Sequence, residues 1–336
     1  MSALPPRVSV LLPVKDAEGT LPECLASLRA QTLAEHEVVA VDDGSTDGSR
    51  ALLERAAEED PRVRVLRSTG RGLVSALNAG AAAARAPLVA RMDADDVALK
   101  DRLRRQATRL EADEKLDVLG TQVEVLGGAR NDGMRAYVLW SNALQDDAAM
   151  RRDLLVESPL VHPSAMMRTA ALLGLGGYRD YDGPEDYDLW LRAAAAGFRF
   201  SKLPEVLLQW RDSERRLTRR DPRYAPARFF ARKLQALLEG PLAAGGPVVV
   251  WGAGEIGKAW ARALRARGVL LCAFVEVDPR KLGQRIHGAP VLGVDEAKAL
   301  GPALHLAAVG QPGARERIRE EARRLWIAEA ALIAVA

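Results

Sequence analysis

The chain has only two cysteines, Cys24 and Cys272, which lie in different halves of its 336 residues. They do not form a Cys-x-x-Cys pair, so the sequence predicts neither a disulfide framework nor a zinc knuckle. This cysteine usage fits a reducing, cytoplasmic compartment. We expect no signal peptide before the first strand. Apolar runs are interrupted before they reach the roughly 18 residues of a membrane-spanning helix, so we expect none.

The chain also lacks a strong charge of either sign. Lys and Arg total 48 against 45 for Asp and Glu, which gives a net charge of +3. This excess is too mild to indicate a nucleic-acid-binding protein. Of the four histidines, His36, His287 and His305 belong to no recognisable cluster. A hydrophobic content of 48% with 28% charged residues is typical of a soluble globular protein, and the length allows two domains.

Strands and helices alternate along the first part of the chain. The hydrophobic pattern predicts strands at 8–13, 37–42, 63–67 and 87–92, separated by helices at 20–31, 48–59 and 72–84. Further along it predicts a helix near 101–113, a strand near 117–126, a segment near 160–168 and a helix near 186–197. Residues 127–158 show weak periodicity. The alternation predicts an α/β fold with a mostly parallel sheet and helices on both faces.

The segment Arg91-Met92-Asp93-Ala94-Asp95-Asp96 places three carboxylates directly after a predicted strand. Ligands of open α/β sheets bind at this edge. Carboxylates this close repel one another unless a positive charge lies between them. Mg²⁺ or Mn²⁺, held by oxygen ligands and often shared with a substrate diphosphate, is the usual solution. The alternative is a solvated Asp-rich turn that caps the next helix.

Two other acidic segments occupy comparable positions. Asp42 and Asp43 end the predicted strand 37–42, where acids can accept hydrogen bonds from a nucleobase N–H or from ribose hydroxyls. Alternatively, Asp43 and its polar neighbours serve only the turn and the cap of the following helix. The second segment, Gly183-Pro184-Glu185-Asp186, opens the helix predicted near 186–197.

Together these segments resemble the family 2 glycosyltransferases, which share the nucleotide-binding fold called GT-A. The resemblance extends over roughly residues 7 to 212. In the family's order it includes the first strand through Pro13, the segment 37–49, Gly70-Arg71-Gly72, Asn78, the aspartate cluster, His162-Pro163-Ser164, Gly176-Gly177-Tyr178 and Glu185-Asp186. It implies transfer of a sugar from a nucleotide-diphosphate donor, a UDP-sugar first among them, to a saccharide or lipid-linked hydroxyl acceptor. The expected setting is the synthesis of cell-surface polysaccharide or glycolipid.

The resemblance also implies roles for individual residues. Asp95 is the expected metal ligand, assisted by Asp93 or Asp96. Asp186 is the expected catalytic base, and Glu185 then orients the acceptor or holds a loop, although the two could exchange roles. A single base without a covalent intermediate implies inversion at the anomeric carbon. His162 is expected on the acceptor or diphosphate side. The residues expected at the donor nucleotide are Pro13, Val14, Asp16, Asp42, Asp43, Arg71, Asn78 and Asp93.

A second, smaller α/β domain is predicted after the Gly- and Pro-containing break at 240–247. A strand at 247–251 is followed by Gly252-Ala253-Gly254-Glu255-Ile256-Gly257, a helix and a second strand that ends near Glu276. This order is typical of dinucleotide-binding domains. Gly252, Gly254 and Gly257 would let a pyrophosphate approach the helix N-terminus, and Glu276 would meet a ribose. Alternatively, the glycines serve only the packing of the helix on the strand.

The stretch 278–293 is similar to the small Rossmann-like domain that precedes some bacterial sugar acyltransferases. The resemblance covers roughly residues 246 to 336. It leaves open whether the domain binds a nucleotide, regulates the enzyme, channels substrate or forms a homo-oligomer. The predicted domains are therefore a GT-A domain at 1–212, a basic helical linker at 213–245 and a Rossmann-like domain at 246–336.

The linker is rich in arginine and carries one apolar helical face. It is interpreted as a solvated helix packed on its own protein or as a peripheral contact with acidic lipids at the inner face of the membrane. Two other functions compete with sugar transfer for the whole chain. A sugar nucleotidyltransferase would carry a Gly-rich, basic loop after the first strand, where this chain has Pro13-Val14-Lys15-Asp16. A binding, scaffolding or regulatory protein with the second domain as a sensor would not need the acids that are present.

Overall fold

The computed structural model describes residues 5–68, 70–128, 132–213 and 216–336. The chain divides into two compact units, one of residues 1–150 and 158–225 and the other of residues 151–157 and 226–336. Helix α10 (Pro226–Glu239) covers much of the predicted linker and belongs to the second unit, where Phe230 packs on Trp260 with ring centroids 4.6 Å apart. Glu214 and Arg215, also in the predicted linker, lie outside the described residues.

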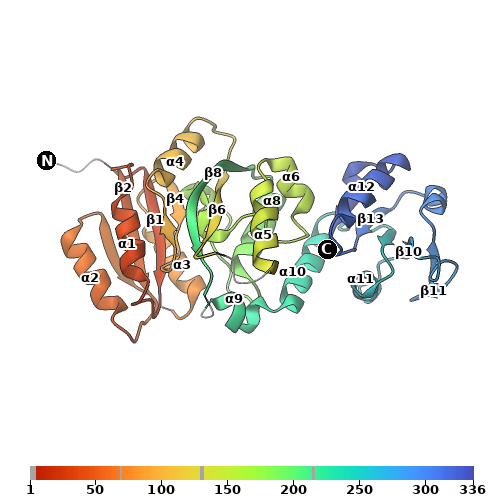
Figure 1. Ribbon diagram of the computed structural model, residues 1–336, viewed down its shortest axis with the longest axis horizontal. Helices are drawn as coiled ribbons and strands as arrows, with labels where there is room; N and C mark the ends of the chain where they lie inside the picture. Colours follow the sequence, from red (N-terminus) through yellow and green to blue (C-terminus); the bar gives the residue numbers. More distant parts are fainter. Residues whose placement is uncertain (1–4, 69, 129–131, 214–215) are drawn as a thin grey trace. The chain divides into compact units, whose positions relative to one another are not determined.

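The first unit is built on an eight-stranded sheet in the order β3-β2-β1-β4-β7-β6-β8-β5. Strands β1, β2, β4, β6 and β8 are labelled in Figure 1. Strands β1 to β4 run parallel to one another, and β7 pairs antiparallel with both β4 and β6. β8 runs parallel to β6 and antiparallel to β5. The strands are β1 (Val8–Val14), β2 (His36–Asp42), β3 (Val63–Arg67), β4 (Leu88–Arg91), β5 (Val97–Ala98), β6 (Val118–Leu126), β7 (Met166–Arg168) and β8 (Phe200–Arg211).

Helices cover both faces of this sheet because successive strand residues point to opposite sides. Val10 and Leu12 of β1 join the core formed with α1 and α4, whereas Leu11 faces Gly80 of α3. The helices of the unit are α1 (Leu21–Arg29), α2 (Ser49–Glu59), α3 (Leu73–Ala83), α4 (Arg102–Glu111), α5 (Asp132–Ala143), α7 (Thr169–Gly174), α8 (Glu185–Ala195) and α9 (Leu217–Arg220). Helix α6 (Asp147–Asp153) begins in this unit, and its last residues belong to the segment 151–157 of the second unit. The predicted mostly parallel α/β fold is confirmed.

Strand β1 lies between β2 and β4. After β1 the chain adds β2 and β3 on one side of β1, and after β3 it crosses back to add β4 on the other side. The carboxyl ends of these parallel strands meet at one edge. Val14 lies opposite Asp42, the Asp43 N–H donates to the Val14 carbonyl at 2.9 Å, and the Met92 N–H donates to the Leu11 carbonyl at 3.1 Å. The acids that follow β2 and β4 are thereby brought to the position where open α/β sheets bind ligands.

Strand β8, the longest strand of the sheet, was not predicted from the sequence. Its apolar pattern is interrupted by Pro204, which cannot donate to a ladder and argues against a strand. The structure accommodates Pro204 at an irregularity, because Thr121 pairs with Leu203 and the next residue, Gln122, pairs with Val206. The weakly periodic stretch 127–158 contains α5 and α6, whose few buried residues explain the weak signal.

The second unit contains a six-stranded sheet in the order β11-β12-β10-β9-β13-β14. All neighbours pair in parallel except β11 and β12. The elements are β9 (Val248–Trp251), α11 (Glu255–Arg265), β10 (Leu271–Val275), β11 (Arg285–Ile286), β12 (Ala289–Leu292), β13 (Leu304–Ala307), α12 (Ala314–Arg324) and β14 (Leu332–Ala334). Buried Trp251 donates its indole N–H to His305 Nδ1 at 3.0 Å, which satisfies a polar group within the core.

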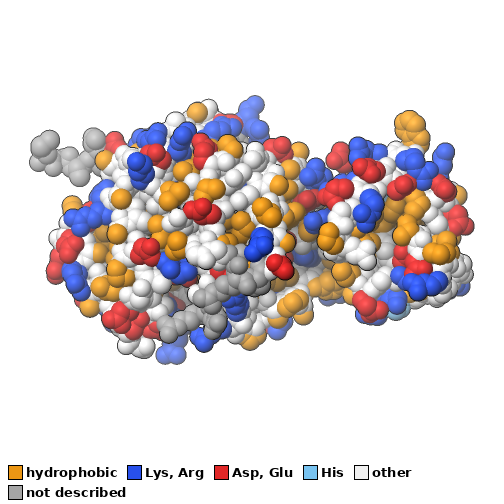
Figure 2. Space-filling view, in the orientation of Figure 1, with side chains coloured by type: hydrophobic (Ala, Val, Ile, Leu, Met, Phe, Trp, Pro, Cys, Tyr) orange, Lys and Arg blue, Asp and Glu red, His pale blue; other side chains and the backbone are white. Residues whose placement is uncertain are grey.

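Charged side chains of both signs are interspersed over the face of the protein shown in Figure 2. This distribution agrees with the small net charge of the sequence. Within the part of the chain that the structure describes, no helix combines the length and apolar character needed to cross a membrane.

The turn between β9 and α11 requires glycine at two positions. Gly252 has a φ of +100°, a backbone conformation that residues with a side chain rarely adopt. A Cβ on Gly257 would lie 1.9 Å from the Gly252 carbonyl oxygen, which is backbone and cannot move aside. A Cβ on Gly254, by contrast, would meet no heavy atom within 4 Å. Gly252 is therefore required by its backbone conformation and Gly257 by close packing.

We predict that Gly257→Ala lowers the free energy of unfolding of the second unit by about 1–3 kcal/mol, the usual cost of overpacking. Gly254→Ala, the matched control, should change it by less than about 0.5 kcal/mol, as expected for an unobstructed surface position. Urea denaturation followed by tryptophan fluorescence measures both effects, since Trp251 and Trp260 are buried in this unit. Equal stability of the two variants would contradict the close packing at Gly257.

Candidate functional site

Asp93, Asp95 and Asp96 follow β4 and form one cluster of carboxylates. One oxygen of each lies within 4.8 Å of the others. Asp93 forms an ion pair with buried Arg91, the last residue of β4. Asp96 is only 1% exposed; its Oδ1 accepts the Arg211 N–H at 2.8 Å, and its Oδ2 has no hydrogen-bond partner among the described residues.

The electrostatics of this cluster favour a positive ligand. Burial and the charge of Asp93 raise the pKa of Asp95 to about 6. Burial, together with the charges of Asp93 and Asp95, raises the pKa of Asp96 well above its usual range. Negative charge is therefore costly here without further compensation. Three close carboxylates with an unsatisfied buried oxygen fit a hard divalent cation such as Mg²⁺ or Mn²⁺.

The end of β8 and the segment after it also reach this cluster, which the sequence analysis did not anticipate. The Arg211 guanidinium donates to the Asp95 carbonyl at 2.7 Å. Arg216 lies 3.8 Å from the centroid of the Trp210 ring, and its positive charge opposes the rise in the pKa of Asp95. Arg216 belongs to the predicted linker at 213–245, and Arg211 lies at the end of the predicted GT-A domain. The apolar run that ends in Trp210-Arg211 was the available signal, and Pro204 obscured it.

Glu185 and Asp186 occupy the first turn of α8 and differ in exposure. Glu185 is 3% exposed; its Oε2 accepts the Tyr224 hydroxyl at 2.6 Å, and its Oε1 lies 3.8 Å from His162 Nδ1. Asp186 is partly exposed, and its Oδ1 accepts the Tyr187 N–H at 2.7 Å. A carboxylate that takes a proton from an incoming hydroxyl must be reachable. Asp186 meets this requirement and Glu185 does not.

His162 lies in a buried cluster beside Glu185. Its Nε2 is 2.9 Å from the Tyr178 hydroxyl, and its ring meets Trp190 edge-on with centroids 6.0 Å apart. Burial and the nearby charge of Arg91 lower the pKa of His162 well below its usual range, so the ring is neutral at physiological pH. Arg91 thus links the aspartate cluster to the buried cluster around His162. It forms an ion pair with Asp93, and its positive charge acts to lower the pKa of both His162 and Glu185.

Asp42 and Asp43, expected at the donor nucleotide, are both buried and bonded to the turns that follow them. Asp42 Oδ1 accepts the Ser45 N–H at 3.0 Å. Both oxygens of Asp43 accept the Gly72 N–H at 3.0 Å, and Lys15 Nζ lies 3.8 Å from Asp43 Oδ2. These bonds hold the loops at the carboxyl edge together, as the turn-forming alternative predicts.

The other residues expected at the donor lie on the same edge with different surroundings. Pro13 and Val14 end β1, and Asp16, which has a φ of +48°, accepts the Thr46 N–H at 2.7 Å. Arg71 is exposed in the loop before α3. Asn78 of α3 exchanges two hydrogen bonds with the Tyr178 backbone, at 2.8 and 2.9 Å, and thereby ties α3 to the loop before α8. A donor-binding role for each of these residues stays a prediction.

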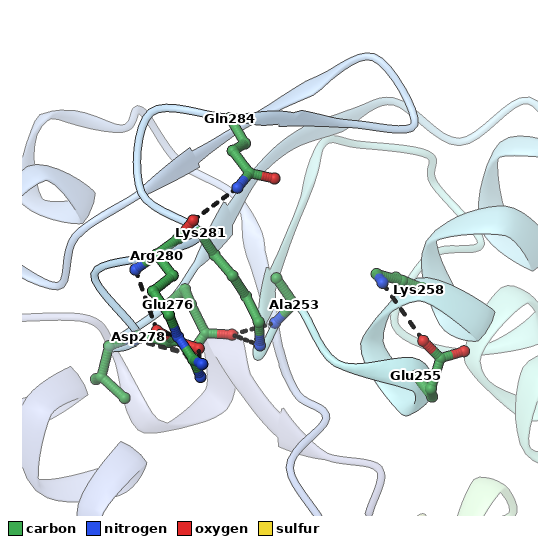
Figure 3. Close-up of polar contacts among 9 residues, drawn as sticks. Ala253, Glu255, Lys258, Glu276, Asp278, Arg280, Lys281 and Gln284 are labelled. Atoms are coloured by element: carbon green, nitrogen blue, oxygen red, sulfur yellow. Dashed lines mark hydrogen bonds and ion pairs between the residues drawn. The ribbon is translucent and has the colours of Figure 1, made fainter.

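In the second unit, the glycine turn and Glu276 lie together (Figure 3). Glu276 Oε2 accepts the Ala253 N–H and the Lys281 ammonium, each at 2.9 Å, and Oε1 accepts the Val277 N–H at 2.9 Å. Burial opposes the ionised form, but these hydrogen bonds outweigh it and lower the pKa of Glu276. The carboxylate expected to meet a ribose is therefore bound to the turn and to Lys281 in the structure described here.

Comparison with known proteins identifies relatives of the first unit. A family model described as glycosyl transferase family 2 matches residues 9–175. EpsE of Bacillus subtilis (strain 168), named as a glycosyltransferase, is 31% identical over 225 residues, which are 66% of this chain and 78% of EpsE. The amylovoran biosynthesis glycosyltransferase AmsE of Erwinia amylovora is 32% identical over 198 residues, covering 59% of this chain and 72% of AmsE.

Two solved structures share the fold. S. aureus TarS 1–349 in complex with UDP-GlcNAc has a TM-score of 0.57 at 21% identity, over 69% of this chain and 66% of TarS 1–349, so the match spans just under two thirds of that protein. The mannosyltransferase PcManGT from Pyrobaculum calidifontis, in complex with GDP-Man and Mn²⁺, has a TM-score of 0.50 at 19% identity over 98% of this chain and 85% of that one. At these identities the likeness concerns the fold.

The carboxylate cluster predicts a pH-dependent cost to stability in metal-free protein. Because Asp95 has a folded pKa of about 6, above its ordinary value, it favours the folded state at low pH, and this contribution is lost as pH rises through 6. Asp95→Asn should therefore raise the melting temperature at pH 8 by roughly 2–4 °C and give no gain at pH 4. Thermal unfolding in EDTA measures this change.

The control is Asp180→Asn, which removes an exposed carboxylate outside the cluster and should leave the melting temperature nearly unchanged at both pH values. A stabilisation by Asp95→Asn that is the same at pH 4 and pH 8 would show that charge repulsion is not its cause.

Proposed function

The chain belongs to glycosyl transferase family 2, and we propose that it is a metal-dependent, inverting enzyme that transfers a sugar from a nucleotide-diphosphate donor to a hydroxyl acceptor. One observation carries the proposal. The first unit holds a carboxylate cluster suited to a cation, and it also holds a separate, reachable carboxylate at Asp186 suited to a base. Glycosyl transfer with a diphosphate leaving group requires both a positive charge on the diphosphate and a base for the acceptor hydroxyl.

Asp95 and Asp93 would hold the cation, which we propose is Mn²⁺ or Mg²⁺. When bound, such a cation acts as a Lewis acid that neutralises the charge of the departing diphosphate. Asp96 would assist Asp95 and Asp93 through Oδ2, because the Arg211 N–H occupies only its Oδ1. PcManGT, a protein of the same fold, is described in complex with Mn²⁺.

Asp186 would take the proton of the acceptor hydroxyl as this oxygen attacks the anomeric carbon. Glu185 is buried against Tyr224 and His162, so we assign it to holding the first turn of α8. With one reachable carboxylate acting as base and none assigned as a nucleophile, the reaction is a direct displacement, which inverts the anomeric configuration. Neutral His162 would line the acceptor or diphosphate side.

We propose a UDP-sugar as the donor, bound at the edge formed by Pro13, Val14, Asp16, Asp43 and Arg71. TarS, which has the same fold, is described in complex with UDP-GlcNAc. The acceptor would be a saccharide or a lipid-linked saccharide used in cell-surface polysaccharide or glycolipid synthesis, and the name of AmsE supports this setting. Exposed arginines of α9, Arg219 and Arg220, would allow peripheral contact with acidic lipids at the inner face of the membrane.

For the second unit we propose a Rossmann-like domain, similar to that of some sugar acyltransferases, whose glycine turn docks an anionic, nucleotide-like ligand. The exposed N-terminus of α11 follows Gly254, where a Cβ would meet nothing within 4 Å, so a phosphate has room to approach. Lys281, already bound to Glu276 beside the turn, would supply a cation (Figure 3). Transfer chemistry should not require this ligand.

We predict that Asp186→Asn lowers the transfer rate by about 10²- to 10⁴-fold, because it removes the proton acceptor with little change of shape. Donor affinity with Mn²⁺, measured by calorimetry, should stay near that of the wild type. The product of the wild-type reaction should have inverted anomeric configuration by proton NMR. A retained configuration would exclude direct displacement.

The matched control is Asp182→Asn, which removes an exposed acid from the loop before α8 and should keep most of the transfer rate. Glu185→Gln tests the exchange of roles. If Glu185→Gln loses transfer by the larger factor while Asp186→Asn retains it, Glu185 is the base.

For the second unit, we predict that the full-length chain binds two equivalents of UDP and that Gly254→Asp binds one, since a carboxylate at the helix N-terminus repels a phosphate. Gly254→Ala, without the charge, should still bind two. Calorimetry measures the stoichiometry. If the wild type binds only one equivalent of UDP and Asp95→Ala binds none, the second unit does not bind this ligand.

A further inference from the structure

Tyr224 connects the end of the first unit to the acidic pair of α8. It lies in the short 3-10 helix η2 (Pro222–Tyr224), which follows α9 along the chain. Asp221 caps this helix by accepting the Arg223 backbone N–H at 2.9 Å, and the Arg223 guanidinium also donates to Asp221 Oδ2 at 2.6 Å. The turn is thus held by its own hydrogen bonds, and its tyrosine donates to Glu185 Oε2 at 2.6 Å.

Glu185 is surrounded by titratable and charged groups from several elements. These groups are His162 of η1 (His162–Ser164), Arg91 of β4, Asp93 after β4, Tyr178 before α8, Asp186 of α8, and Arg223 and Tyr224 of η2. His162 Nδ1, at 3.8 Å, is too far away for a hydrogen bond. The short bond from the Tyr224 hydroxyl is therefore the contact that most directly holds the Glu185 carboxylate.

We propose that Tyr224 is a positioning residue for the transfer reaction: its hydroxyl holds ionised Glu185 in the interior and thereby places Asp186, the next residue of the same helical turn, toward the acceptor. The inference rests on the proposed function. It assigns a role to a residue that belongs to none of the sequence motifs described above. Tyr224 lies in η2, the last turn of the first unit.

The physical basis is the cost of burying a carboxylate. Burial raises the pKa of Glu185, and the hydrogen bond from Tyr224 opposes this rise. A protonated Glu185 would carry a donor hydrogen of its own, facing a hydroxyl that already donates. The bond pattern would then have to rearrange. Because Glu185 and Asp186 are adjacent in the first turn of α8, a rearrangement at Glu185 displaces the base.

The test compares Tyr224→Phe with Tyr181→Phe in the full-length protein. Tyr181 lies in the segment before α8, and its hydroxyl donates to the Pro184 carbonyl at 2.8 Å, so Tyr181→Phe removes a hydrogen bond to a backbone carbonyl. We expect Tyr224→Phe to shift the acidic limb of the pH–kcat profile upward by about one to two pH units, the worth of a hydrogen bond to a charged group. Tyr181→Phe should leave the profile unshifted.

A second readout does not depend on activity. Because the Tyr224 bond favours ionised Glu185, the loss of melting temperature in Tyr224→Phe should be greater at pH 8 than at pH 4, where Glu185 is protonated with or without its partner. Tyr181→Phe should lose the same amount at both pH values.

Equal losses at pH 4 and pH 8 with an unshifted rate profile would overturn the inference and reduce Tyr224 to a packing role. Absence of sugar transfer by the wild type would count against the proposed function instead, and the melting measurements would still decide whether Tyr224 holds ionised Glu185.

Discussion

Repulsion among carboxylates at the end of a buried strand is the constraint on which this site depends. β4 delivers Asp93, Asp95 and Asp96 to one point, and burial makes their charges expensive. Two groups partly offset this negative charge: buried Arg91 forms an ion pair with Asp93, and the Arg211 backbone N–H donates to Asp96. The remaining deficit of positive charge is what a divalent cation would fill, so the same repulsion that costs stability in the metal-free protein would favour the bound metal.

The two adjacent acids of α8 show how local burial separates roles that their sequence leaves equivalent. Glu185 and Asp186 are neighbours on one helical turn, yet one points into a cluster of His162, Tyr178 and Tyr224 and the other remains reachable from solvent. A buried carboxylate with a hydroxyl donor suits a fixed structural position, and a reachable one suits proton transfer. The partner that makes the difference, Tyr224, is contributed by a segment almost forty residues further along the chain.

Much of the architecture could be predicted because local pattern and tertiary context agree. Strands β1, β2 and β4 are largely apolar, and β3 alternates valine and leucine with arginine. The predicted bounds of all four strands differ from the observed ones by at most one residue at every end. β8 could not be predicted, because Pro204 is a poor strand residue and is tolerated only at an irregular pairing with β6. Helices α5 and α6 escaped detection because few of their residues are buried, so their hydrophobic periodicity is weak.

By itself, the sequence determined the alternation of strands and helices, and hence which acids follow β2 and β4 and would share one sheet edge. This information is local: it lies in apolar periodicity and in the residues that end each strand. Tertiary structure decided what surrounds those acids. Only the folded chain brings Arg211, the last residue of the missed strand, and Arg216, which follows that strand, to the aspartate cluster. Only the folded chain ties Asn78 to Tyr178 and places Tyr224 on Glu185. These contacts join residues far apart along the chain, and their energies depend on burial and distance, which no local pattern encodes.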